Sequence, residues 1–417
     1  MKKRILVKGP ALSRSGYGVQ SRFAINALRS REDIFDIYIV NISWGTTGHV
    51  AENTEEISYI KETMLRTQMY AAQGGQFDIS LQITVPNEFE KIAPVNIGYT
   101  AGIETTKVAM PWIGKSNQFM DNLIVVSNHA RKVFEQTTYD VTDQEGKEHK
   151  GWGLQIPIQA VNYPVRKFDP APVDITFTTD KNFMVVSQWA PRKNLENTIK
   201  WFVENFRDNS EVGLVLKTNT ASDSIMDREH TYKRLKGLLE AVGEHKCKVY
   251  FLHGELTPNE LTWLYQHPTM KALINIGHGE GFGLPLFEAA YNGLSLITPT
   301  WSGQMDFICK KNKKGKAVPR VNRVEYDLHE VQPAAVWPGI IEKDSKWCFA
   351  RETSYKRALQ NALLKEAHYK QEAKALQSHI IETFTTEKMY DDFVSCIYNP
   401  TEEELEWASA LGEIEMI

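Results

Sequence analysis

Short apolar runs alternate with amphipathic stretches along the first third of the chain. The runs predict β-strands, and they cover residues 4–8, 35–42, 77–83, 95–99 and 123–127. Residues 19–28 place apolar side chains at helical spacing directly after a glycine-containing loop, which predicts a helix. Because strands that alternate with helices form parallel sheets, this part of the chain predicts an α/β domain.

The alternation stops in the middle of the chain. Residues 137–153 are polar, charged and contain glycine, so we expect an exposed excursion there. Residues 161–172 contain three prolines, which is typical of a linker.

The alternation then restarts and predicts a second α/β domain. The predicted strands cover residues 183–187, 212–217, 249–252, 272–276 and 295–298, and the predicted helices cover 195–206, 228–242, 258–265 and 285–292. The pattern of residues 355–393 predicts a long helical tail. We expect the acidic segment from residue 402 onward to be peripheral.

These patterns predict two Rossmann-like, doubly wound parallel-sheet domains that face a central cleft. We place the first domain at residues 1–165 and the second at 166–378. Residues 379–417 form the predicted helical tail, which we expect to pack back towards the first domain.

Composition narrows the class of protein. The chain has 417 residues, of which 42 % are hydrophobic and 24 % charged, as in soluble globular proteins. Its net charge of −4 excludes a uniformly basic nucleic-acid coat.

Four cysteines lie far apart without a CxxC pair, which argues against a zinc site or a disulfide framework and suits a reducing cytosol. We find no signal-peptide core and no apolar run of about 18 residues, so we expect a cytoplasmic protein without a membrane span.

The strongest chemical signal is the string at residues 278–293, which follows a predicted strand. Gly281 and Gly283 remove side chains where a backbone turns sharply or touches a ligand, and Pro285 suits a first helical turn. The free N–H groups of that turn, together with the helix dipole, favour a phosphate group. Ligands of open α/β sheets bind beyond the carboxyl ends of strands, which is where this loop lies.

Two carboxylates flank this turn. Glu280 lies in the loop and Glu288 about two helical turns later. Carboxylates at the two ends of a phosphate-binding turn suit the hydroxyls of a sugar and of a ribose. The alternative is a helix cap with an exposed glutamate. The whole string favours the ligand site, and a hydrolase is disfavoured because glycosidase carboxylates face each other across a bond.

A basic pair follows another strand. Arg192 and Lys193 come after the strand at 183–187, and two cations at a strand's carboxyl end suit a diphosphate. The alternative is a solvated basic turn.

Two further loops carry weaker signals. Gly16 and Gly18 open the first helix, which is a generic ligand loop in α/β proteins. Glu104 follows the strand at 95–99 and fits an acceptor-side base, a hydrogen-bond acceptor, or equally an ion pair with Lys107.

Metal chemistry has no support in the sequence. The chain lacks a DxD pair and an HExxH motif, and its histidines, His129 among them, do not cluster. We expect no metal and no cofactor, so a phosphate leaving group would be handled by Arg192, Lys193 and helix N-termini.

A basic run stands out in this acidic protein. Seven cations occupy residues 310–323 with no acidic residue among them. Such a run suits a polyanion or, as is usual for charge runs, a solvated loop.

The string from Glu280 to Glu288 resembles the E-x7-E signature of family-4 retaining glycosyltransferases of GT-B fold. The resemblance implies that Lys193 neutralises the donor diphosphate, Glu288 binds the nucleotide ribose and Glu280 lies near the transferred sugar. It also implies a set of further donor-binding residues, namely Gly16, Gly18, Arg192, Gly281, Phe282, Gly283 and Leu284. The family often has arginine where this chain has Gln188, so either Arg192 compensates or the donor grip is weaker.

Residues 97–107 and 125–129 are similar to glycosyltransferases encoded by tailed phages, several of which glycosylate hydroxymethylated bases in their own DNA. This similarity implies a host cytoplasm as the location. It also implies a modified duplex as acceptor, and the acceptor-binding candidates are then Glu104, Lys107, His129, Lys310, Lys311, Lys313, Lys314 and Lys316.

The combined prediction is a retaining, metal-independent glycosyltransferase that uses a nucleotide diphosphate sugar, UDP-linked. The predicted catalytic residues are Glu280, Lys193, Arg192 and Glu104. Three hypotheses stay open: transfer to hydroxymethylated DNA bases, which requires the basic run to line the cleft; transfer to a saccharide, a lipid-linked glycan or a small molecule; and non-catalytic binding of a nucleotide sugar.

Overall fold

The first sheet contains six parallel strands. The computed structural model describes residues 2–142, 146–311 and 314–398. The strand order is β2-β1-β3-β4-β5-β8. The bounds are β1 (Lys3–Gly9), β2 (Phe35–Asn41), β3 (Ile79–Ile83), β4 (Val95–Thr100), β5 (Asn122–Val125) and β8 (Ile158–Ala160). Every residue of β3 is buried, as expected for a central strand of a parallel sheet covered on both faces.

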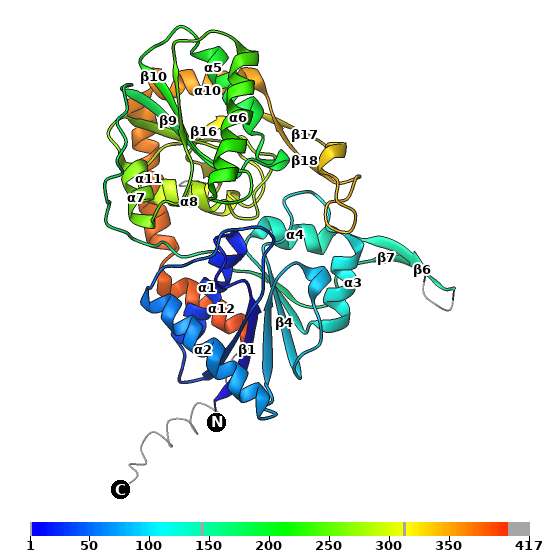
Figure 1. Cartoon of the computed structure of the whole chain (residues 1–417). Helices are drawn as coiled ribbons and strands as arrows, with labels where there is room; N and C mark the ends of the chain where they lie inside the picture. Colours follow the sequence, from blue (N-terminus) through cyan, green and yellow to red (C-terminus); the bar gives the residue numbers. More distant parts are fainter. Residues whose placement is uncertain (1, 143–145, 312–313, 399–417) are drawn as a thin grey trace.

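Helices connect these strands. They are α1 (Gly16–Arg29), α2 (Glu55–Ala72), α3 (Met110–Phe119) and α4 (Asn128–Gln136), with a short 3-10 turn η1 (Pro86–Glu88). The predicted excursion is an exposed hairpin of β6 (Tyr139–Thr142) and β7 (Glu148–Trp152), which extends away from the body of the domain (Figure 1).

The second sheet also contains six parallel strands, in the order β11-β10-β9-β12-β13-β16. The bounds are β9 (Lys181–Val186), β10 (Val212–Lys217), β11 (Lys248–Leu252), β12 (Met270–Ile274), β13 (Leu296–Pro299) and β16 (Asn322–Val324). The prediction of two doubly wound parallel-sheet domains is therefore confirmed. Residues 322–324, at the end of the basic run, form β16, in which Asn322 and Val324 are buried beside β13.

Helices again cover this sheet. They are η2 (Pro191–Lys193), α5 (Leu195–Asn205), α6 (Ile225–Val242), α7 (Pro258–Gln266), α8 (Leu284–Tyr291), α9 (Met305–Ile308) and α10 (Glu352–Leu364). Two hairpins extend from it. One joins β14 (Cys309–Lys311) to β15 (Ala317–Pro319), and the other joins β17 (Tyr326–Glu330) to β18 (Lys346–Ala350) through η3 (Pro333–Ala335).

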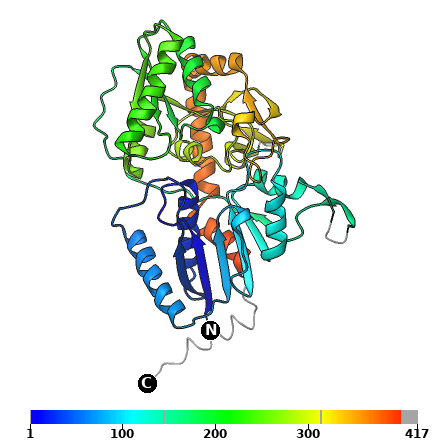
Figure 2. The same ribbon diagram turned by 45° about the vertical axis from the view of Figure 1, so that its right-hand side comes forward.

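The predicted single helical tail is three helices. After α10 the chain forms α11 (Glu366–Thr383) and α12 (Thr386–Ile397), and Thr385 caps the start of α12. Figure 2 shows the two sheets in separate lobes, with the orange-red helices passing from one lobe to the other. Helix α12 packs against α1, where the Phe393 ring lies 5.2 Å from that of Phe23. The exact domain boundaries stay a prediction.

The order of strands decides where a ligand can bind. In each sheet the direction of strand succession reverses beside the first strand, between β1 and β3 and between β9 and β12. Open α/β sheets bind ligands at such switch points, beyond the carboxyl ends of the strands. None of the helices in the part of the chain that the structure describes has the length and apolar character needed to cross a bilayer.

Candidate functional site

A cavity lies between the two domains at these switch points. Its volume is about 560 Å³, which is within the range of small-molecule sites. Its walls are the loops that follow β1, β2 and β4 in the first domain and β9, β10 and β12 in the second. The two loops that the sequence predicts to bind a ligand, after β9 and β12, therefore line the same cavity.

The glycines of the loop after β12 permit close contact between the domains. A Cβ atom on Gly279 would lie 2.6 Å from the carbonyl oxygen of Glu104, and one on Gly281 would lie 3.0 Å from that of Ala101. Gly283 precedes α8 with φ +94°, a conformation that side chains rarely adopt. Gly279 and Gly281 thus allow the two domains to approach each other, and Gly283 allows the turn into α8.

A cluster of four charged side chains forms one end of the cavity. Lys193 Nζ donates to the two carboxylate oxygens of Glu280 at 2.6 and 2.8 Å, and Arg192 Nη1 donates at 3.2 Å. Asn275 Nδ2 adds a hydrogen bond of 2.9 Å. Arg192 also lies 3.1 Å from Glu104 of the first domain, so two carboxylates from different domains meet at one guanidinium.

These contacts shift the pKa values of Glu280 and Lys193. Burial alone would raise the pKa of Glu280, but Lys193 and Arg192 outweigh burial and lower this pKa to about 2. Burial and the neighbouring Arg192 lower the pKa of Lys193. Glu280 is therefore ionised at neutral pH and forms a fixed negative charge between two cations.

The depressed pKa of Glu280 predicts a pH-dependent stability. A group whose pKa is lower in the folded state stabilises it above the ordinary pKa, near 4.5, and this contribution is lost as the pH falls towards about 2. We expect the thermal stability of the wild type to fall faster than that of Glu280→Gln between about pH 5 and pH 2. Calorimetry of both proteins across this range measures the difference, and parallel pH profiles would contradict the assignment.

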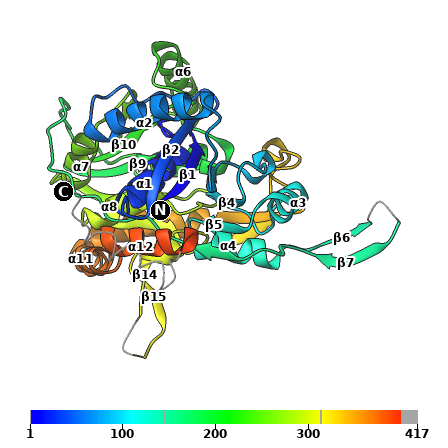
Figure 3. The same ribbon diagram turned by 90° about the horizontal axis from the view of Figure 1, so that it is seen from below.

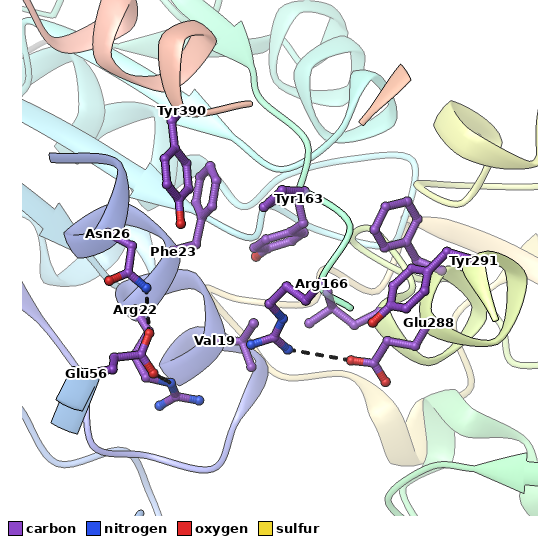
Figure 4. Close-up of a pocket in the computed structure, with 13 residues that line it drawn as sticks. Val19, Arg22, Phe23, Asn26, Glu56, Tyr163, Arg166, Glu288, Tyr291 and Tyr390 are labelled. Atoms are coloured by element: carbon purple, nitrogen blue, oxygen red, sulfur yellow. Dashed lines mark hydrogen bonds and ion pairs between the residues drawn. The ribbon is translucent and has the colours of Figure 1, made fainter. Parts of the chain in front are cut away.

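The second carboxylate of the motif has a different environment. Arg166 Nη2, from the linker, lies 3.8 Å from Glu288 Oε1, and Tyr265 donates to Oε2 at 3.4 Å. Figure 4 shows Arg166 pointing towards Glu288 in a small pocket of about 50 Å³ beside the main cavity. Burial raises the pKa of Glu288. The two glutamates thus have opposite pKa shifts, because cations surround only Glu280 closely.

Most of the predicted donor-binding residues line the cavity together. They are Gly16, Arg192, Lys193, Gly281, Phe282, Gly283, Leu284 and Glu288, and the predicted catalytic residues Glu104 and Glu280 line it too. Gly18 does not line it. A Cβ atom on Gly18 would lie 1.9 Å from the carbonyl oxygen of Ser13, so this glycine permits the tight packing of the loop that precedes α1.

Of the other predicted acceptor residues, Lys107, His129, Lys310, Lys314 and Lys316 lie outside the cavity lining. Lys107 forms an ion pair with Asp344 at 2.7 Å and not with Glu104. His129 packs its ring against Trp301, and burial lowers its pKa to about 4.

The basic run lies on the β14–β15 hairpin. Lys310, Lys311, Lys314 and Lys316 belong to this hairpin, and Lys313 lies outside the described residues. Figure 3 shows the hairpin projecting from the side of the molecule opposite α2 and α6. Lys310, Lys314 and Lys316 do not line the cavity between the domains.

The segment after β13 is a structural support that the sequence analysis did not identify. Ser302 Oγ accepts a hydrogen bond from the backbone N–H of Glu280 at 2.8 Å, and the Gly303 N–H donates to the Glu280 carbonyl at 2.9 Å. The sequence feature that could have identified this support is the Ser-Gly pair shortly after a predicted strand.

In the part of the chain that the structure describes, no group of three or more histidine, cysteine or acidic side chains is arranged to hold a metal ion.

Comparisons with known proteins identify the architecture. No protein-family model and no curated protein matches the chain. Sucrose-phosphate synthase from Thermosynechococcus elongatus aligns with a TM-score of 0.59 and 12 % identity, over 94 % of this chain and 98 % of that one. Anabaena Alr3699/HepE, solved with UDP and glucose, aligns with a TM-score of 0.55 and 11 % identity over the same shares. Staphylococcus aureus TarM aligns with a TM-score of 0.47 and 15 % identity over 77 % of this chain, which spans only 55 % of TarM.

At identities this low, the alignments with sucrose-phosphate synthase and HepE establish the fold and nothing further. Both sheets are parallel, their switch points face one another across the cavity, and the C-terminal helix returns to the first domain. The chain therefore has the GT-B fold, in which two Rossmann-like domains face each other across a cleft.

Proposed function

We propose that this protein is a retaining glycosyltransferase that moves a sugar from a UDP sugar to a hydroxyl acceptor. The observation that carries the proposal is the charge cluster of Glu280, Lys193 and Arg192 beside the N-terminus of α8, inside the interdomain cavity. The solved structure of HepE with UDP and glucose supports the choice of donor, since that protein shares the fold.

The cluster suits a diphosphate because its cations keep donors available. A lysine ammonium has three N–H groups, and Lys193 directs two hydrogen bonds to Glu280. Its third N–H, the Arg192 guanidinium and the first N–H groups of α8 are the proposed ligands of the donor phosphates. The backbone of residues 281–284 covers the diphosphate in this proposal, and Glu288 accepts hydrogen bonds from the ribose.

The proposed reaction takes place on one face of the donor sugar. The acceptor oxygen bonds to the anomeric carbon, the bond from that carbon to the phosphate oxygen breaks, and the acceptor proton passes to the leaving phosphate. Arg192 and Lys193 stabilise the charge that develops on this phosphate, and closure of the domains excludes water. Glu280 lies near the transferred sugar and Glu104 on the acceptor side. The proposal involves no metal.

Mass spectrometry tests the donor and the acceptor together. The full chain is incubated with a panel of UDP sugars and either duplex DNA that carries 5-hydroxymethylcytosine or a panel of saccharides. We expect a hexose or pentose increment on one acceptor class, lost in Lys193→Ala and Glu280→Ala. UDP-sugar binding without any transfer or UDP release would favour a non-catalytic binder, and absence of binding would contradict the proposed function.

The DNA acceptor remains a hypothesis for this experiment. It requires the basic run to line the cleft, whereas Lys310, Lys314 and Lys316 of that run lie on the β14–β15 hairpin, outside the cavity lining. The contacts around the cavity therefore favour an acceptor recognised within the cleft over one held by this hairpin.

A further inference from the structure

An aromatic side chain outside the proposed donor site lies on the first-domain wall of the cavity. Trp44 lies in the loop between β2 and α2 and lines the cavity together with Tyr17. The Trp44 side chain is half-buried, so part of its ring remains accessible. The donor-binding groups proposed above lie mainly on the opposite wall, which belongs to the second domain.

Neighbouring contacts fix the Trp44 ring. Its centroid lies 4.3 Å from that of Tyr17, with 34° between the ring planes, so one face of the indole is covered. The Tyr17 hydroxyl is in turn hydrogen-bonded to Thr100 Oγ1 at 2.8 Å. The Trp44 carbonyl accepts hydrogen bonds from the N–H and the hydroxyl of Thr47. The Trp44 backbone is thus held in a closed turn, and its indole packs against the Tyr17 ring.

The first-domain wall is not arranged to bind a polyanion. Arg14, the cation that this wall contributes, lies 3.2 Å from Glu52 and 2.8 Å from Glu255, so its charge is neutralised. Glu104 is paired with Arg192 at the domain boundary. The wall therefore offers an aromatic face and a carboxylate, which suit a ring with hydroxyl groups.

We propose that Trp44 is the stacking surface of an acceptor subsite for a hydroxyl-bearing ring compound. The ring of the acceptor packs on the accessible indole face, and its hydroxyl group faces the pair of Glu104 and Arg192. A pyranose ring and a nucleobase both supply such a face. This inference rests on the proposed function, because it assigns the acceptor side of the same cavity.

Ligand-observed saturation-transfer NMR tests the subsite on the full chain loaded with UDP. One arm uses 5-hydroxymethyl-2′-deoxycytidine and the other methyl α-D-glucopyranoside. We expect one of these probes to receive saturation on its ring protons. Trp44→Ala is expected to weaken that binding about tenfold, while Trp44→Phe, which keeps an aromatic face, stays within about threefold of the wild type.

Controls separate this inference from the proposed function. UDP affinity, measured by calorimetry, is expected to change much less in Trp44→Ala than the affinity for the ring probe. Trp337→Ala removes a tryptophan that is 62 % exposed and lies outside the cavity lining, and it is the matched control for probe binding. Equal probe binding by wild type and Trp44→Ala, or no binding of either probe by UDP-loaded protein, overturns the subsite. Failure of the wild type to bind UDP contradicts the proposed function instead.

Discussion

Lys193→Ala is expected to lower the rate of sugar transfer by roughly 10²–10³-fold, the usual cost of removing one donor that stabilises charge in a transition state. Lys193 contributes hydrogen bonds of 2.6 and 2.8 Å to Glu280, and its remaining N–H is the proposed ligand of the leaving phosphate. Its removal also leaves Glu280, whose side chain is 8 % exposed, with fewer compensating contacts. Breaking a buried pair costs about 3–5 kcal/mol, so the melting temperature is expected to fall as well.

A double variant separates the loss of catalysis from the loss of stability. Lys193→Met with Glu280→Gln removes both charges, which is expected to recover most of the melting temperature but none of the activity. Lys181→Ala is the matched control, because Lys181 pairs with Glu211 on the surface and such exposed pairs contribute about 0–1 kcal/mol. Transfer by Lys193→Ala at the wild-type rate would refute the role of this lysine.

Gly303→Ala is expected to reduce transfer by roughly 10²-fold although residue 303 has no proposed contact with a substrate. A Cβ atom at this position would lie 1.9 Å from the Gly281 carbonyl oxygen and 2.4 Å from its carbon, and both atoms belong to the backbone. The loop from Glu280 to Gly281 must therefore move. Overpacking of this kind costs about 1–3 kcal/mol, and the displaced loop no longer presents its backbone to the donor phosphates. Calorimetric titration with UDP and initial rates measure both effects.

Gly237→Ala provides the matched control for the added methyl group. Gly237 is exposed in α6, and a Cβ atom there meets nothing within 4 Å. Because alanine is a better helix former than glycine by about 1 kcal/mol, this variant is expected to melt slightly higher and to keep its activity. If Gly303→Ala bound UDP as tightly as Gly237→Ala, the segment after β13 would not support the loop.

The outline of the fold could be predicted because its signals are local. Buried parallel strands need short continuous apolar runs, and those at residues 79–83 and 212–217 lie within the predicted ranges. The loop with Gly281 and Gly283 was recognisable because its glycines and Pro285 stand between an apolar run and a helical pattern. The helical tail was less predictable, since its breaks at Lys365 and Phe384 have no glycine or proline to mark them.

By itself, the sequence determined the alternating strands and helices and the two sheets. It also determined which loops follow the carboxyl ends of the strands, where a ligand can bind. Which side chains meet in the cavity depended on the tertiary structure. Glu104 and Arg192 are 88 positions apart, and only the facing of the two sheets brings them together. The same holds for the position of Trp44 in the cavity and for that of the basic hairpin outside it. Local patterns fix which backbone segments form strands and helices, whereas contacts between distant side chains depend on how the two domains pack together.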